Sequence, residues 1–143
     1  MGSEWIWPVP GITGISSYYG PRDGGFHHGV DIAGNGFSDK PIVASKGGTV
    51  TVSINGCPHN YGKTDYLWDT CGGGYGNYVM IDHEDNTKSV YAHLSRATAK
   101  SGESVKQGQI IGYGGSTGMS TGPHIHFEVQ YNGQTTNPMQ YFN

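Results

Sequence analysis

The sequence predicts an all-β protein built mostly from antiparallel strands, and three observations indicate this fold class. Glycine is abundant, with 25 residues in a chain of 143, and charged residues make up only 13%. Short runs of β-branched and aromatic residues are separated by glycine- and asparagine-containing turns, which is typical of strands joined by tight connections. No stretch has a convincing helical period, so helices are not expected to form the framework.

The expected strands follow one another closely along the chain, after an aromatic, proline-bounded segment at 5–11. They are predicted at 12–19, 41–44, 48–54, 77–82, 88–93, 105–111 and 124–131. Polar turns at 45–47 and 84–86 are expected to join neighbouring strands. Asn132-Gly133, after the last of these strands, is a strong signal for a two-residue hairpin turn.

Composition limits the domain organisation and the partners. Met1-Gly2-Ser3 is interpreted as an expression-vector remnant, and residues 4–143 are expected to form a single domain with one core. A formal net charge of −3 provides no broad basic surface, so nucleic acid is not an expected partner. No apolar run is long enough to cross a bilayer.

The segment 124–131 carries the strongest chemical signal. His124, His126 and Glu128 alternate with the apolar residues Ile125 and Phe127. Alternation with a period of two is typical of a half-buried strand, whose successive side chains point to opposite faces. The two imidazoles are therefore expected to lie side by side, an arrangement that favours a shared metal, proton or substrate.

A second polar cluster lies far upstream, in the segment 26–33. Read as an extended chain, it places His27, Gly29 and Asp31 on one face, and the glycine leaves room for a close approach to the backbone. One histidine and one aspartate from this segment, with one histidine from 124–126, form a nitrogen and oxygen ligand set that zinc accepts. A catalytic zinc site keeps its fourth position open for water.

These segments, with Tyr91-Ala92-His93-Leu94-Ser95 between them, resemble the lysostaphin-like zinc endopeptidases, which cut bacterial peptidoglycan. Further family segments occur in the same order between Ser16 and Phe142: Tyr19-Gly20-Pro21-Arg22, Pro41-Ile42-Val43-Ala44, Gly48-Thr49-Val50, Gly76-Asn77-Tyr78-Val79, Gly108-Gln109-Ile110-Ile111-Gly112, Gly115-Ser116-Thr117-Gly118 and Asn137-Pro138. Each is weak alone, but the ordered set is strong evidence. The resemblance implies a substrate groove running across the sheet.

The resemblance also implies roles for five residues. His27, Asp31 and His126 are expected to bind one Zn²⁺ per chain, and His93 and His124 are expected to be catalytic. Bound zinc lowers the pKa of its water to about 7 and polarises the scissile carbonyl. Histidine can move protons or stabilise an oxyanion near neutral pH, and the sequence leaves open which of His93 and His124 does which.

Other residues near these segments carry two interpretations each. Tyr18 and Tyr19 are candidates to reach the cleft, because some relatives place a tyrosine near the metal, or they pack as ordinary aromatics. Glu128 either orients a ligand or is a strand carboxylate at the groove edge. His28 and His83 are expected to be structural.

Cys57 and Cys71 flank a long polar loop between two strands. A disulfide is the simplest interpretation in a protein expected to be exported, and closing such a loop stabilises by about 3 kcal/mol. The alternative, a second metal site that includes His59, lacks a clear fourth ligand. Within the loop, Tyr66 and Trp68 either line the substrate groove or pack inward.

The glycine-rich run 112–122 is interpreted as a groove wall along which a substrate backbone lies close. The expected function is therefore zinc-dependent hydrolysis of peptide bonds in peptidoglycan stems or cross-bridges. A catalytically silent relative that binds peptidoglycan or activates another hydrolase is one alternative, and a β-rich carbohydrate-binding module is another. We expect a monomer that is secreted, associated with the cell wall or phage-borne, its targeting parts lying outside this sequence.

Overall fold

A computed structural model describes residues 4–57, 71–118, 120 and 122–142, and the statements below concern these residues. The strands are β1 (Ile15–Ser17), β2 (Gly20–Arg22), β3 (Gly25–His27), β4 (Val30–Ile32), β5 (Pro41–Val43), β6 (Gly48–Ile54), β7 (Asn77–Asp82), β8 (Thr87–Ala97), β9 (Ser104–Val105), β10 (Ile110–Gly114), β11 (Ile125–Tyr131) and β12 (Gln134–Thr136). Two short 3₁₀ helices complete the description, η1 (Cys71–Gly74) and η2 (Pro138–Tyr141).

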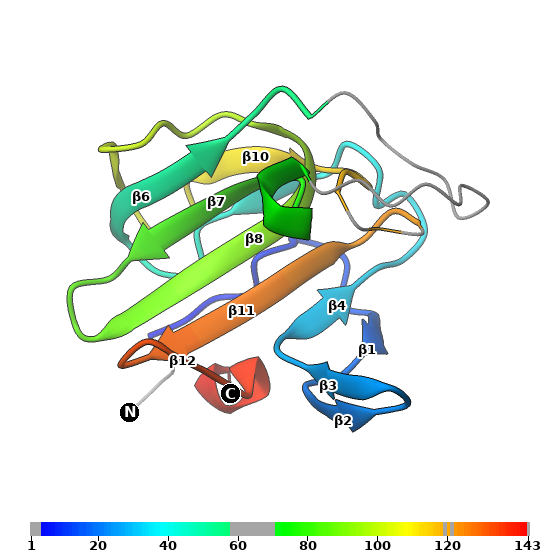
Figure 1. Ribbon diagram of the computed structural model, residues 1–143. Coiled ribbons are helices and arrows are strands. Elements are labelled where there is room, and N and C mark those ends of the chain that lie inside the picture. Colours follow the sequence, from blue (N-terminus) through cyan, green and yellow to red (C-terminus); the bar gives the residue numbers. More distant parts are fainter. Residues whose placement is uncertain (1–3, 58–70, 119, 121, 143) are drawn as a thin grey trace.

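The strands form one large antiparallel sheet and a separate small hairpin (Figure 1). The large sheet has ten strands in the order β1-β4-β11-β8-β7-β6-β9, with β12 beside β11 and with β10 between β8 and β5. Strands β2 and β3 pair only with each other. The predicted all-β, mostly antiparallel fold class is confirmed, and no helix in the described part of the chain is long and apolar enough to cross a membrane.

Most of the long predicted strands are present. Strands β6 and β7 have the predicted bounds, and β7 pairs with β8 across the turn at 84–86. At the predicted hairpin turn, Asn132 and Gly133 have φ values of 52° and 81°, and Tyr131 pairs with Gln134. Positive φ at both central residues is what a tight two-residue hairpin requires.

Three parts of the strand prediction were incomplete. The segment 105–111 is divided between β9 and β10, which pair with different neighbours. Strands β5 and β6 do not pair with each other, because β5 lies beside β10 and β6 beside β7. The short strands β2, β3, β4 and β12 are three residues each, too short for a period of two to be visible in the sequence.

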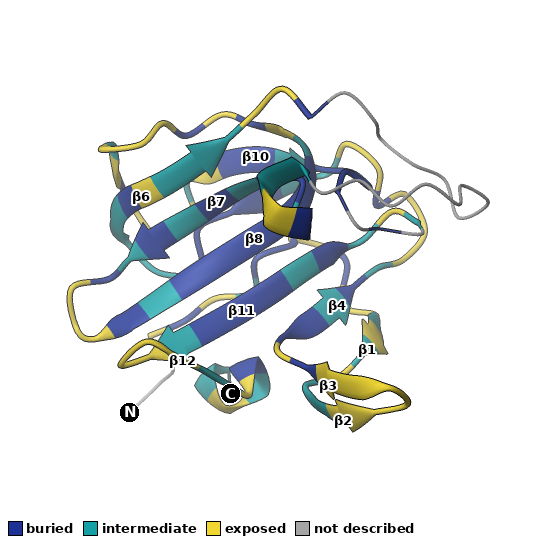
Figure 2. Ribbon diagram, in the orientation of Figure 1, coloured by how far each residue is buried: buried dark blue, intermediate teal, exposed yellow. Residues whose placement is uncertain are grey.

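The core lies along β8 and β11, whose ribbons are mostly buried in Figure 2, whereas the β2–β3 hairpin is largely exposed. Tyr91 on β8 and Phe127 on β11 are fully buried, and their rings lie 5.3 Å apart. Fully burying a large apolar side chain contributes about 1.5–3 kcal/mol. Strands β8 and β11, which carry His93 and His126, are therefore firmly packed.

Glycines of the 112–122 run allow close approach, but the neighbour is this chain itself. A Cβ at Gly112 would meet the Arg96 carbonyl, and one at Gly114 would meet the Phe37 ring. Gly118 has a φ of +75° and lies directly against the backbone of Gly74 and Gly76. Gly112, Gly114 and Gly118 therefore pack against other segments of the protein and do not serve a substrate backbone, whereas Ser120 of the same run lines the main cleft.

Candidate metal centre and cleft

The pairing of β4 with β11 brings the upstream and downstream polar residues together. Asp31 lies directly opposite His126 in this register, so the two side chains share one face of the sheet. His27 is the last residue of β3, and the chain turns back through His28-Gly29 into β4. Residues 95 positions apart are thereby placed in contact.

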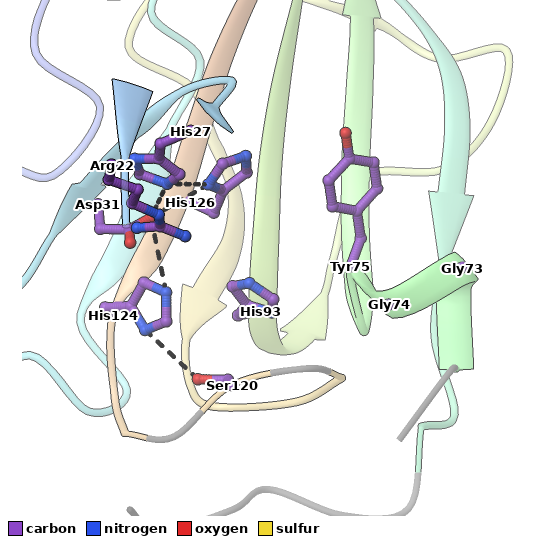
Figure 3. Close-up of a pocket in the computed structure, with 10 residues that line it drawn as sticks. All are labelled: Arg22, His27, Asp31, Gly73, Gly74, Tyr75, His93, Ser120, His124 and His126. Carbon is purple, nitrogen blue, oxygen red and sulfur yellow. Dashed lines mark hydrogen bonds and ion pairs between the residues drawn. The ribbon is translucent and has the colours of Figure 1, made fainter. Parts of the chain in front are cut away.

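Three side-chain atoms converge at this point (Figure 3). His27 Nε2 lies 3.2 Å from Asp31 Oδ1 and 3.2 Å from His126 Nδ1. His126 Nδ1 lies 3.0 Å from Asp31 Oδ1, which closes a nearly equilateral triangle. A search of the described histidine, cysteine and acidic side chains for groups close enough to hold a metal ion gives this trio.

Gly29 is needed for this approach. A Cβ at this position would collide with the Phe127 carbonyl oxygen and would lie 3.0 Å from both Glu128 Cγ and His126 Cε1. The expectation that the glycine allows a close approach to the backbone is confirmed. The segment that approaches is β11, which carries His126.

The hydrogen bonds behind the two histidines fix their tautomers. His27 Nδ1 lies 3.0 Å from the Tyr18 carbonyl oxygen, which can only accept, so Nδ1 carries the proton. His126 Nε2 donates to Glu128 Oε2 over 2.7 Å. In each neutral imidazole the nitrogen that faces the triangle therefore keeps its lone pair.

Three lone-pair atoms at these distances repel one another unless a positive charge, a proton or a metal ion, lies between them. A tetrahedral zinc ion with Zn–N bonds of about 2.0–2.1 Å separates its ligand atoms by about 3.3 Å, close to the spacing seen here. The site favours such a charge: burial alone would lower the pKa of His126, but the Asp31 and Glu128 carboxylates raise it to about 9. Without a metal the charge is a proton on His126, which a bound Zn²⁺ would replace. The residues therefore fit a zinc ion.

His93 lies beside the triangle in a conformation that few residues adopt. Its φ is +65°, its N–H donates to the Tyr75 carbonyl over 2.7 Å, and its Nδ1 donates to the Thr117 carbonyl over 2.7 Å. Such strain is stored where the surroundings hold a residue firmly. Burial, followed by the charge of His124, lowers the pKa of His93 to about 3, so Nε2 keeps a free lone pair at neutral pH.

His124 also lies beside the triangle, close to His93 (Figure 3). Its Nδ1 donates to the Gly122 carbonyl over 2.8 Å, and its Nε2 lies 3.7 Å from Asp31 Oδ1. The His93 and His124 rings are 4.9 Å apart, so both imidazoles border the same space. The sequence-predicted metal and catalytic residues are thus all brought together.

These side chains line an open cleft of about 400 Å³. Its lining residues are Arg22, His27, Asp31, Gly73, Gly74, Tyr75, His93, Ser120, His124 and His126 (Figure 3). Sequence reasoning did not identify Tyr75, Ser120 or the two glycines as site residues, and it treated Arg22 only as part of a family segment. The available signal for Tyr75 was its place directly after the three glycines 72–74.

Comparison with protein families agrees with this geometry. The model of peptidase family M23 matches residues 25–138, which include all five of the histidine and aspartate positions described above. The chain belongs to peptidase family M23. The resemblance to the lysostaphin-like peptidases is thereby confirmed.

Relatives of this M23 chain are named for different activities. It is 40% identical over 113 residues to the DD-carboxypeptidase/endopeptidase Mpg of Neisseria meningitidis, matching 79% of this chain and 22% of that protein. It is 34% identical over 139 residues to the murein hydrolase activator NlpD of Escherichia coli, matching 97% of this chain and 31% of that protein. The chain thus spans between a fifth and a third of these curated relatives.

Among solved structures, the M23 chain is similar to the catalytic domain of the antimicrobial peptidase lysostaphin from Staphylococcus simulans. The TM-score is 0.70 and the identity 33%, and the match covers 90% of each chain. This likeness supports the fold described above over nearly its whole length.

Of the other candidate site residues of the M23 chain, one lies beside the triangle and the others do not line the cleft or are not described. Glu128 is buried and bonded to His126, so it lies behind the triangle and not at an exposed groove edge. Tyr19 donates its hydroxyl to the Thr135 carbonyl over 3.1 Å, and Tyr18 is 64% exposed. Neither tyrosine side chain lines the cleft, although the Tyr18 carbonyl holds His27. Tyr66 and Trp68 lie outside the described residues.

The cysteines of the M23 chain form the predicted disulfide, Cys57–Cys71. Their sulfurs are bonded to each other, so the alternative of a second, thiolate metal site is excluded. Cys71 is the first residue of η1, which also contains the cleft residues Gly73 and Gly74. The cross-link therefore holds one wall of the cleft.

His83 has the structural role expected of it. Its ring bonds to the Gly47 carbonyl at 2.8 Å and to Ser89 Oγ at 2.9 Å, on the side of the sheet that carries the core. His28 lies 3.0 Å from Thr135 Oγ1 near the surface and does not enter the triangle.

Proposed function

We propose that this M23 chain is a zinc-dependent endopeptidase that hydrolyses peptide bonds in bacterial peptidoglycan stems or cross-bridges. The observation that carries the proposal is the triangle of lone-pair atoms on His27, Asp31 and His126, with sides of 3.0–3.2 Å. A zinc ion would stabilise such a triangle, and the cleft beside it leaves space for a fourth ligand and a substrate.

In this proposal His27 Nε2, Asp31 Oδ1 and His126 Nδ1 hold one Zn²⁺. The bound ion supplies a water activated near neutral pH and a polarised substrate carbonyl. Asp31 is ionised in this site: burial alone would raise the pKa of its carboxyl, but the surrounding imidazoles keep that pKa below the ordinary value.

His93 and His124 serve the proton transfers and the developing charge. His93 is neutral, is held through Nδ1, and presents Nε2 as a hydrogen-bond acceptor that can orient a water or a substrate N–H. His124 is held through Nδ1 and presents Nε2 beside Asp31; once protonated, Nε2 can donate to an oxyanion or to a leaving amine. A group in either role is typically worth 10²–10⁴ in rate.

A second candidate function is activation of another hydrolase without cleavage. The 34% identity to the murein hydrolase activator NlpD favours it. The complete set of three ligand residues and two catalytic histidines favours the peptidase, because an activator needs none of them. A carbohydrate-binding module leaves this set unexplained, so we do not retain it.

The proposed substrate lies outside the cytoplasmic membrane, so the protein would act as a secreted, cell-wall-associated or phage-borne monomer. The disulfide supports this setting, since such bonds persist mainly in oxidising compartments.

The two candidate functions are separated by digestion of purified sacculi of several wall types, with mass spectrometry of the released fragments. A peptidase releases fragments with new amino termini when added alone, loses this activity to a chelator and regains it with Zn²⁺. The Asp31→Ala variant serves as the matched inactive control. Release only when another murein hydrolase is present, at equal levels for wild type and Asp31→Ala, would instead establish the activator.

A further inference from the structure

Tyr75 occupies an unusual place between the cleft wall and the triangle. It follows η1 directly, and its ring lines the cleft (Figure 3). The ring is stacked on His126, with centroids 5.9 Å apart and planes inclined by 25°. Tyr75 lies outside the family segments named above, and its contacts indicate its role.

The side chain of Tyr75 ends on the carboxylate that orients a proposed ligand. Its hydroxyl donates to Glu128 Oε2 over 2.5 Å, the same oxygen that accepts from His126 Nε2 over 2.7 Å. Glu128 is only 3% exposed. A buried carboxylate is held where its donors place it, so Tyr75 restricts the position of the oxygen that fixes the His126 tautomer.

The backbone of Tyr75 reaches the other side of the site. Its carbonyl accepts the N–H of His93, which has the strained φ of +65°. One residue therefore contacts both halves of the proposed machinery, the ligand His126 through Glu128 and the catalytic candidate His93 through the main chain. The contact with Glu128 uses the hydroxyl, whereas the contact with His93 uses the backbone carbonyl. Replacing Tyr75 by phenylalanine therefore removes the first contact and keeps the second.

We propose that Tyr75 is a positioning residue that, through Glu128, holds His126 in the orientation and tautomer that bind zinc. The inference rests on the proposed function, because it assumes that the triangle is a zinc site. Groups that orient a metal ligand from behind typically account for 10–100-fold in metal affinity. Tyr75 and Glu128 act in series on one imidazole, so their effects should not add.

The test measures zinc affinity and does not depend on activity. Zinc is titrated against a chromophoric chelator into wild type, Tyr75→Phe, Glu128→Gln and the double variant. Tyr78→Phe is the matched control, because its ring lies 5.0 Å from Tyr75 and no contact with Glu128 is recorded for it among the described residues. We expect each single variant to bind zinc roughly 10–100-fold more weakly. The double variant should be little weaker than the weaker single one, and Tyr78→Phe should match wild type.

Two further readouts separate positioning from general stability. The melting temperature of the zinc-free protein should be similar in Tyr75→Phe and Tyr78→Phe. The visible absorption of the cobalt-substituted protein should change only in Tyr75→Phe and Glu128→Gln, because it reports ligand geometry.

Equal zinc affinity of Tyr75→Phe and Tyr78→Phe would overturn the inference and leave the proposed function standing. Fully additive losses in the double variant would also overturn it, since independent effects do not pass through one imidazole. Failure of wild type to bind zinc would reject the proposed function together with the inference.

Discussion

Replacing Gly29 by alanine should damage the metal centre from behind. The added Cβ would overlap the Phe127 carbonyl oxygen and press on His126 Cε1 at 3.0 Å. Cε1 lies between the two ring nitrogens, so any shift of the ring moves both the proposed zinc ligand Nδ1 and the atom bonded to Glu128. Relief requires β4 and β11 to separate, although they are paired at this point.

The expected magnitude follows from this overlap. Overpacking a tightly packed position costs about 1–3 kcal/mol. For a chain of 143 residues, 1 kcal/mol corresponds to roughly 3 °C, so the melting temperature of Gly29→Ala should fall by roughly 3–9 °C. Because the ring is displaced, zinc affinity should fall by about 10-fold or more.

The assay is thermal unfolding of zinc-free protein combined with zinc titration. Gly25→Ala is a suitable control, since its Cβ would meet nothing within 4 Å and its φ lies outside the left-handed region. That variant should differ from wild type by less than about 1 kcal/mol. If Gly29→Ala matches Gly25→Ala in both stability and zinc affinity, the close approach of β11 to Gly29 is not part of the site.

The remaining predictions concern chemistry, cross-linking and pH. His93→Ala and His124→Ala should keep the zinc but lose about 10²–10⁴ in turnover on wall fragments, and near wild-type turnover in either would remove it from the catalytic set. Reducing Cys57–Cys71 should lower stability by about 3 kcal/mol with zinc retained, and an unchanged denaturation midpoint would contradict this. Burial lowers the pKa of His83 below 6.5, so its neutral ring contributes fully above about pH 6.5 and progressively less as pH falls. Relative to His83→Gln, wild type should therefore lose stability on acidification, and parallel stability–pH curves would refute this.

The sequence predicted the fold well where strands are long enough to show their pattern. The alternation through Ile125 and Phe127 and the Asn132-Gly133 turn are local signals, and the structure follows both. The three-residue strands β2 and β3 were not predicted, because their pairing depends on neighbours and not on their own residues. The division between β9 and β10 was missed for the same reason.

The candidate site was likewise predicted only in part. The residue types pointed to a histidine and an aspartate of 26–33 with one histidine of 124–126, and the family resemblance narrowed this set to His27, Asp31 and His126, whose side chains the structure brings together. Tyr75 was not found, because its partner Glu128 lies 53 positions away and a tyrosine after glycines has many ordinary explanations. Tyr19 was considered a cleft candidate because some relatives place a tyrosine near the metal, but its hydroxyl bonds to the Thr135 carbonyl instead. The family pattern did not indicate where this side chain points.

The central claim is that His27, Asp31 and His126 hold a single zinc ion. Anomalous diffraction at the zinc absorption edge from crystals of zinc-loaded protein tests this claim most directly. The account predicts one anomalous peak per chain, within bonding distance of His27 Nε2, Asp31 Oδ1 and His126 Nδ1, with an open position facing the cleft. A peak centred on His93 and His124, or the absence of any peak at full zinc loading, would contradict the account.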